Sequence, residues 1–120
     1  MNDLNKIFKE ILDVYSSDEA GIPNSIEILN YNNNIDYLII GLRNGVLLVM
    51  EIENNNNEIF LKNTFTKQIG NIPVKLCKNI FYDNNNQYII VTTENTYKLY
   101  LNEFGVTLTT VLIPTVIDLI

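Results

Sequence analysis

The sequence predicts a mainly β fold of antiparallel sheets with one amphipathic helix at its N-terminal end. Three observations support this prediction: apolar runs of strand length, an Asn-Gly turn between two of them, and an internal repeat of about fifty residues. With 120 residues, the chain is a single domain or a fragment of a larger one. The pattern divides it into a helix (1–17), a first β unit (22–70) and a second β unit (71–120).

The first segment has the spacing of an amphipathic helix. Its apolar residues recur every three or four positions: Leu4, Ile7, Phe8, Ile11, Leu12 and Tyr15. Lys6, Lys9, Glu10 and Asp13 take the other side, and Gly21 with Pro23 ends the pattern. We expect the apolar stripe to pack on the chain's own sheet, since no basic polar face favours a membrane surface.

The strands follow in order from Ser25. Residues 37–42 and 46–52 form nearly continuous apolar runs, as expected of strands covered on both faces. Asn44-Gly45 between them predicts a hairpin with a type I′ turn, which needs positive φ at both central residues. After a polar spacer at 54–57, residues 59–65 predict a third strand, and residues 107–113 predict the last one.

The second half of the chain repeats short blocks of the first half. Short blocks recur with nearly equal spacing: Ile22-Pro23 and Ile72-Pro73, Tyr37-Leu38-Ile39-Ile40 and Tyr88-Ile89-Ile90-Val91, Asn44 and Asn95, Leu48 and Leu99, Met50 and Leu101. This period is typical of β-propeller blades with four strands each. The chain offers about two blades, whereas a propeller closes with about four to eight, so sheet edges would remain open in this chain alone.

The composition excludes several kinds of site. With no His and a single Cys, the chain cannot supply the usual zinc ligand sets or an imidazole-based triad. A net charge of -6 opposes phosphate binding, so direct nucleic-acid binding is not expected. No apolar run approaches the roughly 18 residues of a membrane helix. We therefore predict no enzyme, no metal and no cofactor.

The remaining polar and aromatic groups also favour structural roles. Glu51 and Glu53 lie on one face of a strand, which indicates a solvated face, and Cys77 beside Leu76 predicts a buried, inert thiol. The segment 83–86 lacks the glycine and the distal glutamate of a calcium loop. Four tyrosines are predicted to pack within the core or across strands: Tyr82, Tyr88, Tyr97 and Tyr100.

Two separated blocks carry a family resemblance. Leu38-Ile39-Ile40-Gly41 with Leu42-Arg43-Asn44-Gly45-Val46-Leu47-Leu48 forms the first, and Ile69-Gly70-Asn71-Ile72-Pro73-Val74-Lys75-Leu76 the second. From about Ile35 to Leu76 the chain resembles the β-propeller scaffold superfamily of the large propeller subunit of splicing factor 3b. Its sisters are the damaged-DNA-binding scaffold and the large cleavage and polyadenylation factor subunit.

The resemblance implies a non-catalytic scaffold in a nuclear assembly, with helical-repeat or small protein subunits as partners. The matched residues would then be turn and strand determinants: Gly41, Asn44, Gly45, Gly70 and Pro73. The alternative is a compact α+β domain, with the helix lying on one antiparallel sheet. Such a domain would be a cytoplasmic ligand-binding, regulatory or dimerisation module, possible as a homodimer.

Overall fold

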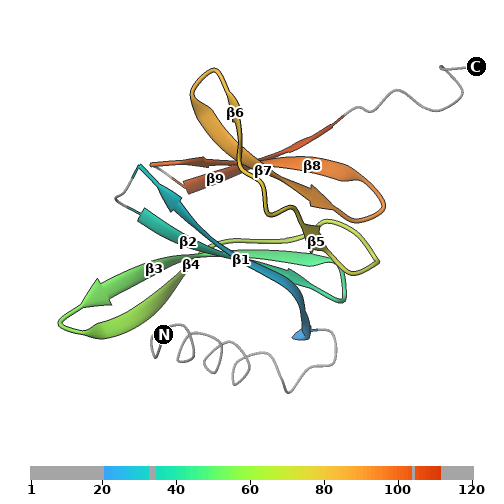
Figure 1. Ribbon diagram of the computed structural model, residues 1–120. Helices are drawn as coiled ribbons and strands as arrows, with labels where there is room; N and C mark the ends of the chain where they lie inside the picture. Colours follow the sequence, from blue (N-terminus) through green and yellow to red (C-terminus); the bar gives the residue numbers. More distant parts are fainter. Residues whose placement is uncertain (1–20, 33–34, 104, 112–120) are drawn as a thin grey trace, which may run out of the picture.

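The computed structural model describes residues 21–32, 35–103 and 105–111, which form strands in two antiparallel sheets (Figure 1). The helix predicted over 1–17 and the end of the strand predicted over 107–113 lie outside the described residues. In the part of the chain that is described, no helix has the length and apolar character needed to cross a membrane.

The first sheet, blade 1, is a four-stranded meander. It contains β1 (Pro23–Tyr31), β2 (Ile35–Leu42), β3 (Val46–Asn55) and β4 (Glu58–Gln68), each hydrogen-bonded to the next in the order of the chain. A bulge between Val49 and Met50 interrupts the β3–β4 register. β2 is almost wholly buried, which fits its continuous apolar run and a position between two covered faces.

The second sheet, blade 2, repeats this order. It contains β5 (Lys75–Leu76), β6 (Phe81–Asp83), β7 (Asn86–Thr92), β8 (Thr96–Asn102) and β9 (Gly105–Thr110). Both β5 and β6 pair with β7, so together they form one interrupted edge that corresponds to β1. The predicted mainly β fold with two propeller-like blades is confirmed.

The turn between β2 and β3 is a hairpin, as predicted, but its predicted turn type was wrong. Gly45 has a φ of 89°, whereas Asn44 does not have a positive φ. The Gly45 N–H donates to the Leu42 carbonyl at 3.3 Å, and the Val46 N–H donates to Asn44 Oδ1 at 3.1 Å. This is the three-residue loop in which a turn is followed by one glycine with positive φ.

Type I′ turns occur instead at two Asn pairs. Asn56 and Asn57 have φ values of 50° and 66°, and Asn84 and Asn85 have values of 50° and 70°. Each pair is a two-residue loop, since Asn55 pairs with Glu58 and Asp83 with Asn86. The polar spacer predicted at 54–57 was therefore wrong: two of its residues extend β3, and the other two form a tight turn.

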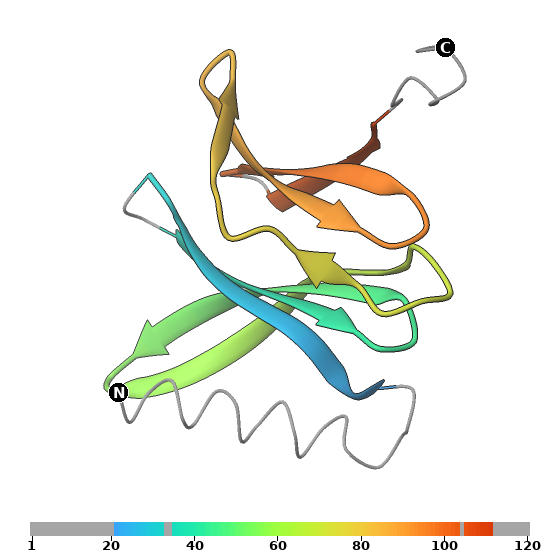
Figure 2. The ribbon, with the colours of Figure 1, turned by 45° about the vertical axis from the view of Figure 1, so that its right-hand side comes forward.

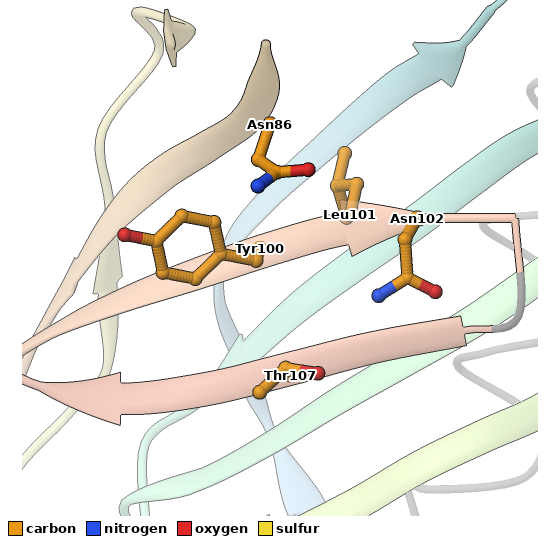
Figure 3. Close-up of a pocket in the computed structure, with 5 residues that line it drawn as sticks. All are labelled: Asn86, Tyr100, Leu101, Asn102 and Thr107. Carbon is orange, nitrogen blue, oxygen red and sulfur yellow. The ribbon is translucent and has the colours of Figure 1, made fainter. Parts of the chain in front are cut away.

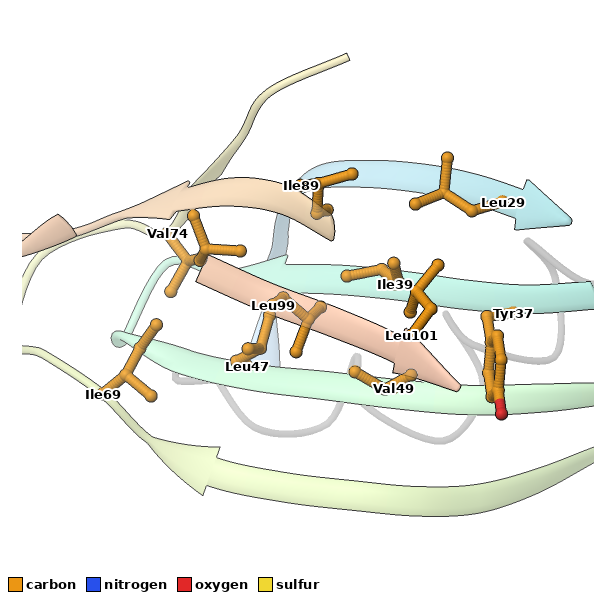
Figure 4. Packing of buried hydrophobic residues seen from close by; sticks show 11 residues of the cluster. Leu29, Tyr37, Ile39, Leu47, Val49, Ile69, Val74, Ile89, Leu99 and Leu101 are labelled. Carbon is orange, nitrogen blue, oxygen red and sulfur yellow. The ribbon is translucent and has the colours of Figure 1, made fainter. Parts of the chain in front are cut away.

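The two blades stack face to face around one hydrophobic core (Figures 1, 2 and 4). Its buried members come from both sheets and from the connection between them: Leu29, Tyr37, Ile39, Leu47, Val49, Ile69, Val74, Ile89, Val91, Leu99 and Leu101. One hydrogen bond joins the two blades, and another joins blade 2 to the connection that follows β4. The Tyr37 hydroxyl donates to the Asn102 carbonyl at 2.9 Å, and the Tyr97 hydroxyl donates to the Ile69 carbonyl at 2.8 Å.

Candidate protein-interaction surface

The sequence repeat identifies a second packing face. In blade 1, side chains of β2 and β3 point into the core between the blades. The repeat carries Tyr37 to Tyr88, and with it Ile39 to Ile90, Leu47 to Lys98 and Val49 to Tyr100. Because strand side chains alternate, and Ile89 and Leu99 point into the core, these four residues of blade 2 lie on its opposite face. We call this the blade 2 outer face.

An aromatic row crosses the blade 2 outer face. Phe81, Tyr88 and Tyr100 are consecutive cross-strand partners on β6, β7 and β8. The ring centroids lie 5.6 Å apart for Phe81 and Tyr88, and 5.1 Å apart for Tyr88 and Tyr100. Lys98 Nζ lies 5.0 Å from the centroid of the Tyr88 ring, a cation–π distance. These contacts order large apolar side chains that remain partly open to solvent, as at protein interfaces.

A cavity of about 260 Å³ adjoins this row (Figure 3). Its lining comes from the start of β7, the end of β8 and the start of β9: Asn86, Tyr100, Leu101, Asn102 and Thr107. Amide and hydroxyl groups predominate in this lining, and they can both donate and accept hydrogen bonds. The lining therefore suits polar groups of a peptide chain and contains no carboxylate or thiol for acid–base or nucleophilic chemistry.

Tyr100 belongs to both the aromatic row and the cavity. Its hydroxyl donates to Asp83 Oδ2 at 3.1 Å. Desolvation raises the pKa of the Tyr100 phenol, and the hydrogen bond to Asp83 acts in the same direction. At neutral pH this group is therefore a neutral hydrogen-bond donor.

The predicted turn residues lie elsewhere, where the β2–β3 hairpin meets the connection between the blades. The Gly45 carbonyl accepts from the N–H groups of Ile69 and Gly70 at 2.9 and 3.3 Å. A Cβ on Gly41 would meet the Val74 side chain at 2.7 Å. Asn44 is half-buried and Pro73 is exposed, and neither residue lines the cavity. None of these five positions contributes to the aromatic row.

Next to this contact, the Glu94 carboxylate binds the backbone of the connection between the blades. The Asn71 N–H donates to both oxygens of Glu94, at 2.9 and 3.0 Å. This backbone hydrogen bond lowers the pKa of the Glu94 carboxyl below its usual value. Through these hydrogen bonds, Glu94 anchors the connection to the β7–β8 loop.

Two predictions for single residues were wrong. Cys77 is half-buried rather than buried, because it lies in the irregular segment that separates β5 from β6. Tyr82 is 69% exposed rather than packed, whereas Tyr88, Tyr97 and Tyr100 do make core or cross-strand contacts. Glu51 and Glu53 lie in β3 and are half-buried, with Lys62 directly opposite Glu51.

Sequence reasoning missed Phe81, Asn86 and Thr107 as surface residues. No motif marks them, because their neighbourhood depends on strand register: Phe81 lies opposite Tyr88, and Thr107 opposite Tyr100. Among the described residues, no group of three or more Cys, Asp or Glu side chains could hold a metal ion.

Stacked antiparallel meanders related by a sequence repeat define a β-propeller segment, and the open aromatic face is suited to protein contact. The model of the RSE1/DDB1/CPSF1 second beta-propeller family matches residues 1–118. The chain belongs to this family, a class of propeller scaffolds whose domains mediate protein interactions. The resemblance to this superfamily is confirmed, and it extends well beyond 35–76. No curated protein matches the chain.

Proposed function

We propose that this chain is a non-catalytic interaction scaffold of a pre-mRNA splicing assembly in the nucleus. In this proposal, the blade 2 outer face binds the sheet of another protein element, and the assembled stack holds helical-repeat or small subunits. The observation that supports the proposal is that the sequence repeat relates two faces: the face of blade 1 that packs on blade 2, and the blade 2 outer face. The blade 1 residues that already pack on a second sheet recur in blade 2 on a face that is still partly open.

Charge supports a protein partner rather than RNA. The chain has a net charge of -6, and counterion release from a phosphate backbone needs clustered Lys and Arg. On the blade 2 outer face, the Lys98 ammonium is directed over the Tyr88 ring. The block Arg43-Asn44-Gly45-Val46-Leu47-Leu48 favours the splicing branch over its sister scaffolds.

The test compares two matched substitutions. Phe81→Ser alters the aromatic row, and Phe60→Ser makes the same change on β4 of the other blade; the two rings are 40% and 47% exposed. Tagged full-length chains are expressed in their own cells, and proteins that copurify are identified by mass spectrometry. We expect splicing subunits with the unmodified chain and with Phe60→Ser, and their loss with Phe81→Ser.

Other outcomes contradict separate parts of the proposal. Copurification of polyadenylation or ubiquitin-ligase subunits would retain the scaffold role and overturn the splicing assignment. Equal recovery with both variants would show that the blade 2 outer face is not the contact surface. Recovery of no protein subunit with the unmodified chain would overturn the scaffold role itself.

A further inference from the structure

Lys98 occupies the middle of the blade 2 outer face. It lies on β8, between its cross-strand partners Ile90 of β7 and Thr109 of β9. The side chain is half-buried, and its Nζ lies 5.0 Å from the centroid of the Tyr88 ring. Since Tyr88 belongs to β7, the ammonium is directed across the face and not past β9, the edge strand. It therefore does not reach water by extending beyond the rim of the sheet.

The sequence repeat shows the environment of this position once a face is covered. Lys98 corresponds to Leu47, whose side chain is 0% exposed in the core between the blades. A second sheet that covers the blade 2 outer face in the same way would remove Lys98 from water. A lysine is almost never fully buried unless it is paired, because desolvation strongly disfavours an isolated ammonium.

The described residues of this chain do not supply that pairing. The Lys98 ammonium interacts with the Tyr88 ring and the Tyr100 hydroxyl, but it makes no ion pair with a described carboxylate. Asp83 is the acidic residue that the described strands place on this face, and its Oδ2 accepts the Tyr100 hydroxyl at 3.1 Å. The charge of Lys98 therefore remains available to a partner.

We infer that the sheet bound by the blade 2 outer face carries a carboxylate, from Asp or Glu, opposite Lys98. The inference rests on the proposed function and makes it more specific, since the partner surface is apolar against Phe81 and Tyr88 and acidic against Lys98. A carboxylate there accepts a charge-assisted hydrogen bond from Nζ. Because a wholly apolar sheet would leave the ammonium buried and unpaired, Lys98 discriminates between partner sheets.

Three substitutions of Lys98 distinguish a charge contact from an apolar one. Lys98→Arg keeps the positive charge, Lys98→Met keeps a flexible apolar stem without charge, and Lys98→Glu reverses the charge. Tagged full-length chains are purified from their own cells with their partner. We expect Lys98→Arg to retain the partner, Lys98→Met to lower its recovery about tenfold or more, and Lys98→Glu to abolish it. Lys67→Glu makes the same reversal at an exposed position on β4 and should leave recovery unchanged.

Crosslinking with a carbodiimide identifies the acidic group directly and needs no disruptive variant. The reagent activates a carboxylate, the Lys98 amine displaces a urea from it, and an amide bond joins the two side chains. We expect peptides in which Lys98 is joined to an Asp or Glu of a copurifying protein. Lys98→Arg is the control, because a guanidinium does not form this bond. This variant should lose the crosslinked peptide and retain the partner.

The outcomes separate this inference from the proposed function. If Phe81→Ser loses the partner whereas Lys98→Met and Lys98→Glu both keep it, the blade 2 outer face is a contact surface and the acidic group is refuted. A Lys98 crosslink to a carboxylate of this chain itself, or no Lys98 crosslink at all, would also overturn the inference. If Phe81→Ser keeps the partner, or if no partner copurifies, the proposed function fails and the inference fails with it.

Discussion

Gly45→Ala tests the contact between the first hairpin and the connection to blade 2. Gly45 has a φ of 89°, where a residue with a Cβ atom is strained by about 1–3 kcal/mol. The new Cβ would also collide with the backbone carbonyl of Gly70, which cannot rotate away as a side chain can. Overpacking of this kind costs about 1–3 kcal/mol. We therefore expect the free energy of unfolding to fall by about 2–6 kcal/mol.

Gly105→Ala is the matched control. Gly105 also has a positive φ, of 135°, but a Cβ there would meet nothing within 4 Å. It should therefore lose only the conformational part, about 1–3 kcal/mol. Urea unfolding of the full chain, followed by tyrosine fluorescence because the chain has no Trp, measures both losses. Equal losses in the two variants would refute the claim that close packing requires a glycine at position 45.

Three further predictions concern the core and its edges. Leu99→Ala removes a fully buried side chain from between the blades and should lower the free energy of unfolding by about 2–5 kcal/mol. Thr109→Ala, at an exposed position, should change it by at most about 0.5 kcal/mol, and thermal unfolding measures both variants. Tyr37→Phe removes a hydrogen bond to a blade 2 carbonyl and should cost about 0.5–1.5 kcal/mol by urea unfolding, whereas the exposed Tyr82→Phe should cost nothing measurable. The pKa of Glu94 is lower in the folded chain than in the unfolded chain, so its ionised form stabilises the fold. This stabilisation is fully present above the ordinary carboxyl pKa, near 4.3, and is lost as the pH falls through the folded-state pKa. Melting temperatures of the unmodified chain and of Glu94→Gln, measured from pH 6 to pH 3, should therefore converge at low pH.

The fold class could be predicted because local and global signals agree. Tyr37-Leu38-Ile39-Ile40 lies in β2, its repeat Tyr88-Ile89-Ile90-Val91 lies in β7, and both strands hold the second position of an antiparallel meander. Leu48 and Leu99 likewise lie in β3 and β8. A strand that is buried on both faces needs apolar residues at consecutive positions, so short apolar runs are sufficient to predict the central strands.

Turn type was harder to predict because the same residues are compatible with several loop conformations. Asn44-Gly45 suits a type I′ turn, but the Asn44 side chain accepts the Val46 N–H, and only the glycine takes positive φ. Asn56-Asn57 was predicted as part of a polar spacer, yet Asn tolerates the left-handed region better than most residues with a Cβ, and both residues have positive φ. A run of Asn at hairpin spacing is therefore a turn signal in its own right.

The candidate surface could not be predicted because it depends on register. Phe81, Tyr88 and Tyr100 become neighbours only when β6, β7 and β8 pair as they do, and a shift of one residue would turn the Tyr88 side chain into the core. The cavity depends on three strand ends that meet in space. No spacing rule along the chain connects Asn86 with Thr107.

The same repeat that predicts two blades also explains why their free faces differ. A two-blade stack has one shared core and two further faces, one on each blade, and these two faces differ in composition. On the face of blade 1 that is turned away from blade 2, Leu38, Ile40 and Leu48 are aliphatic and at most 2% exposed. On the blade 2 outer face, Lys98 replaces an aliphatic residue and the Tyr100 hydroxyl bonds to Asp83, which makes partial exposure tolerable. The composition of the blade 2 outer face therefore suits a contact with a separate sheet.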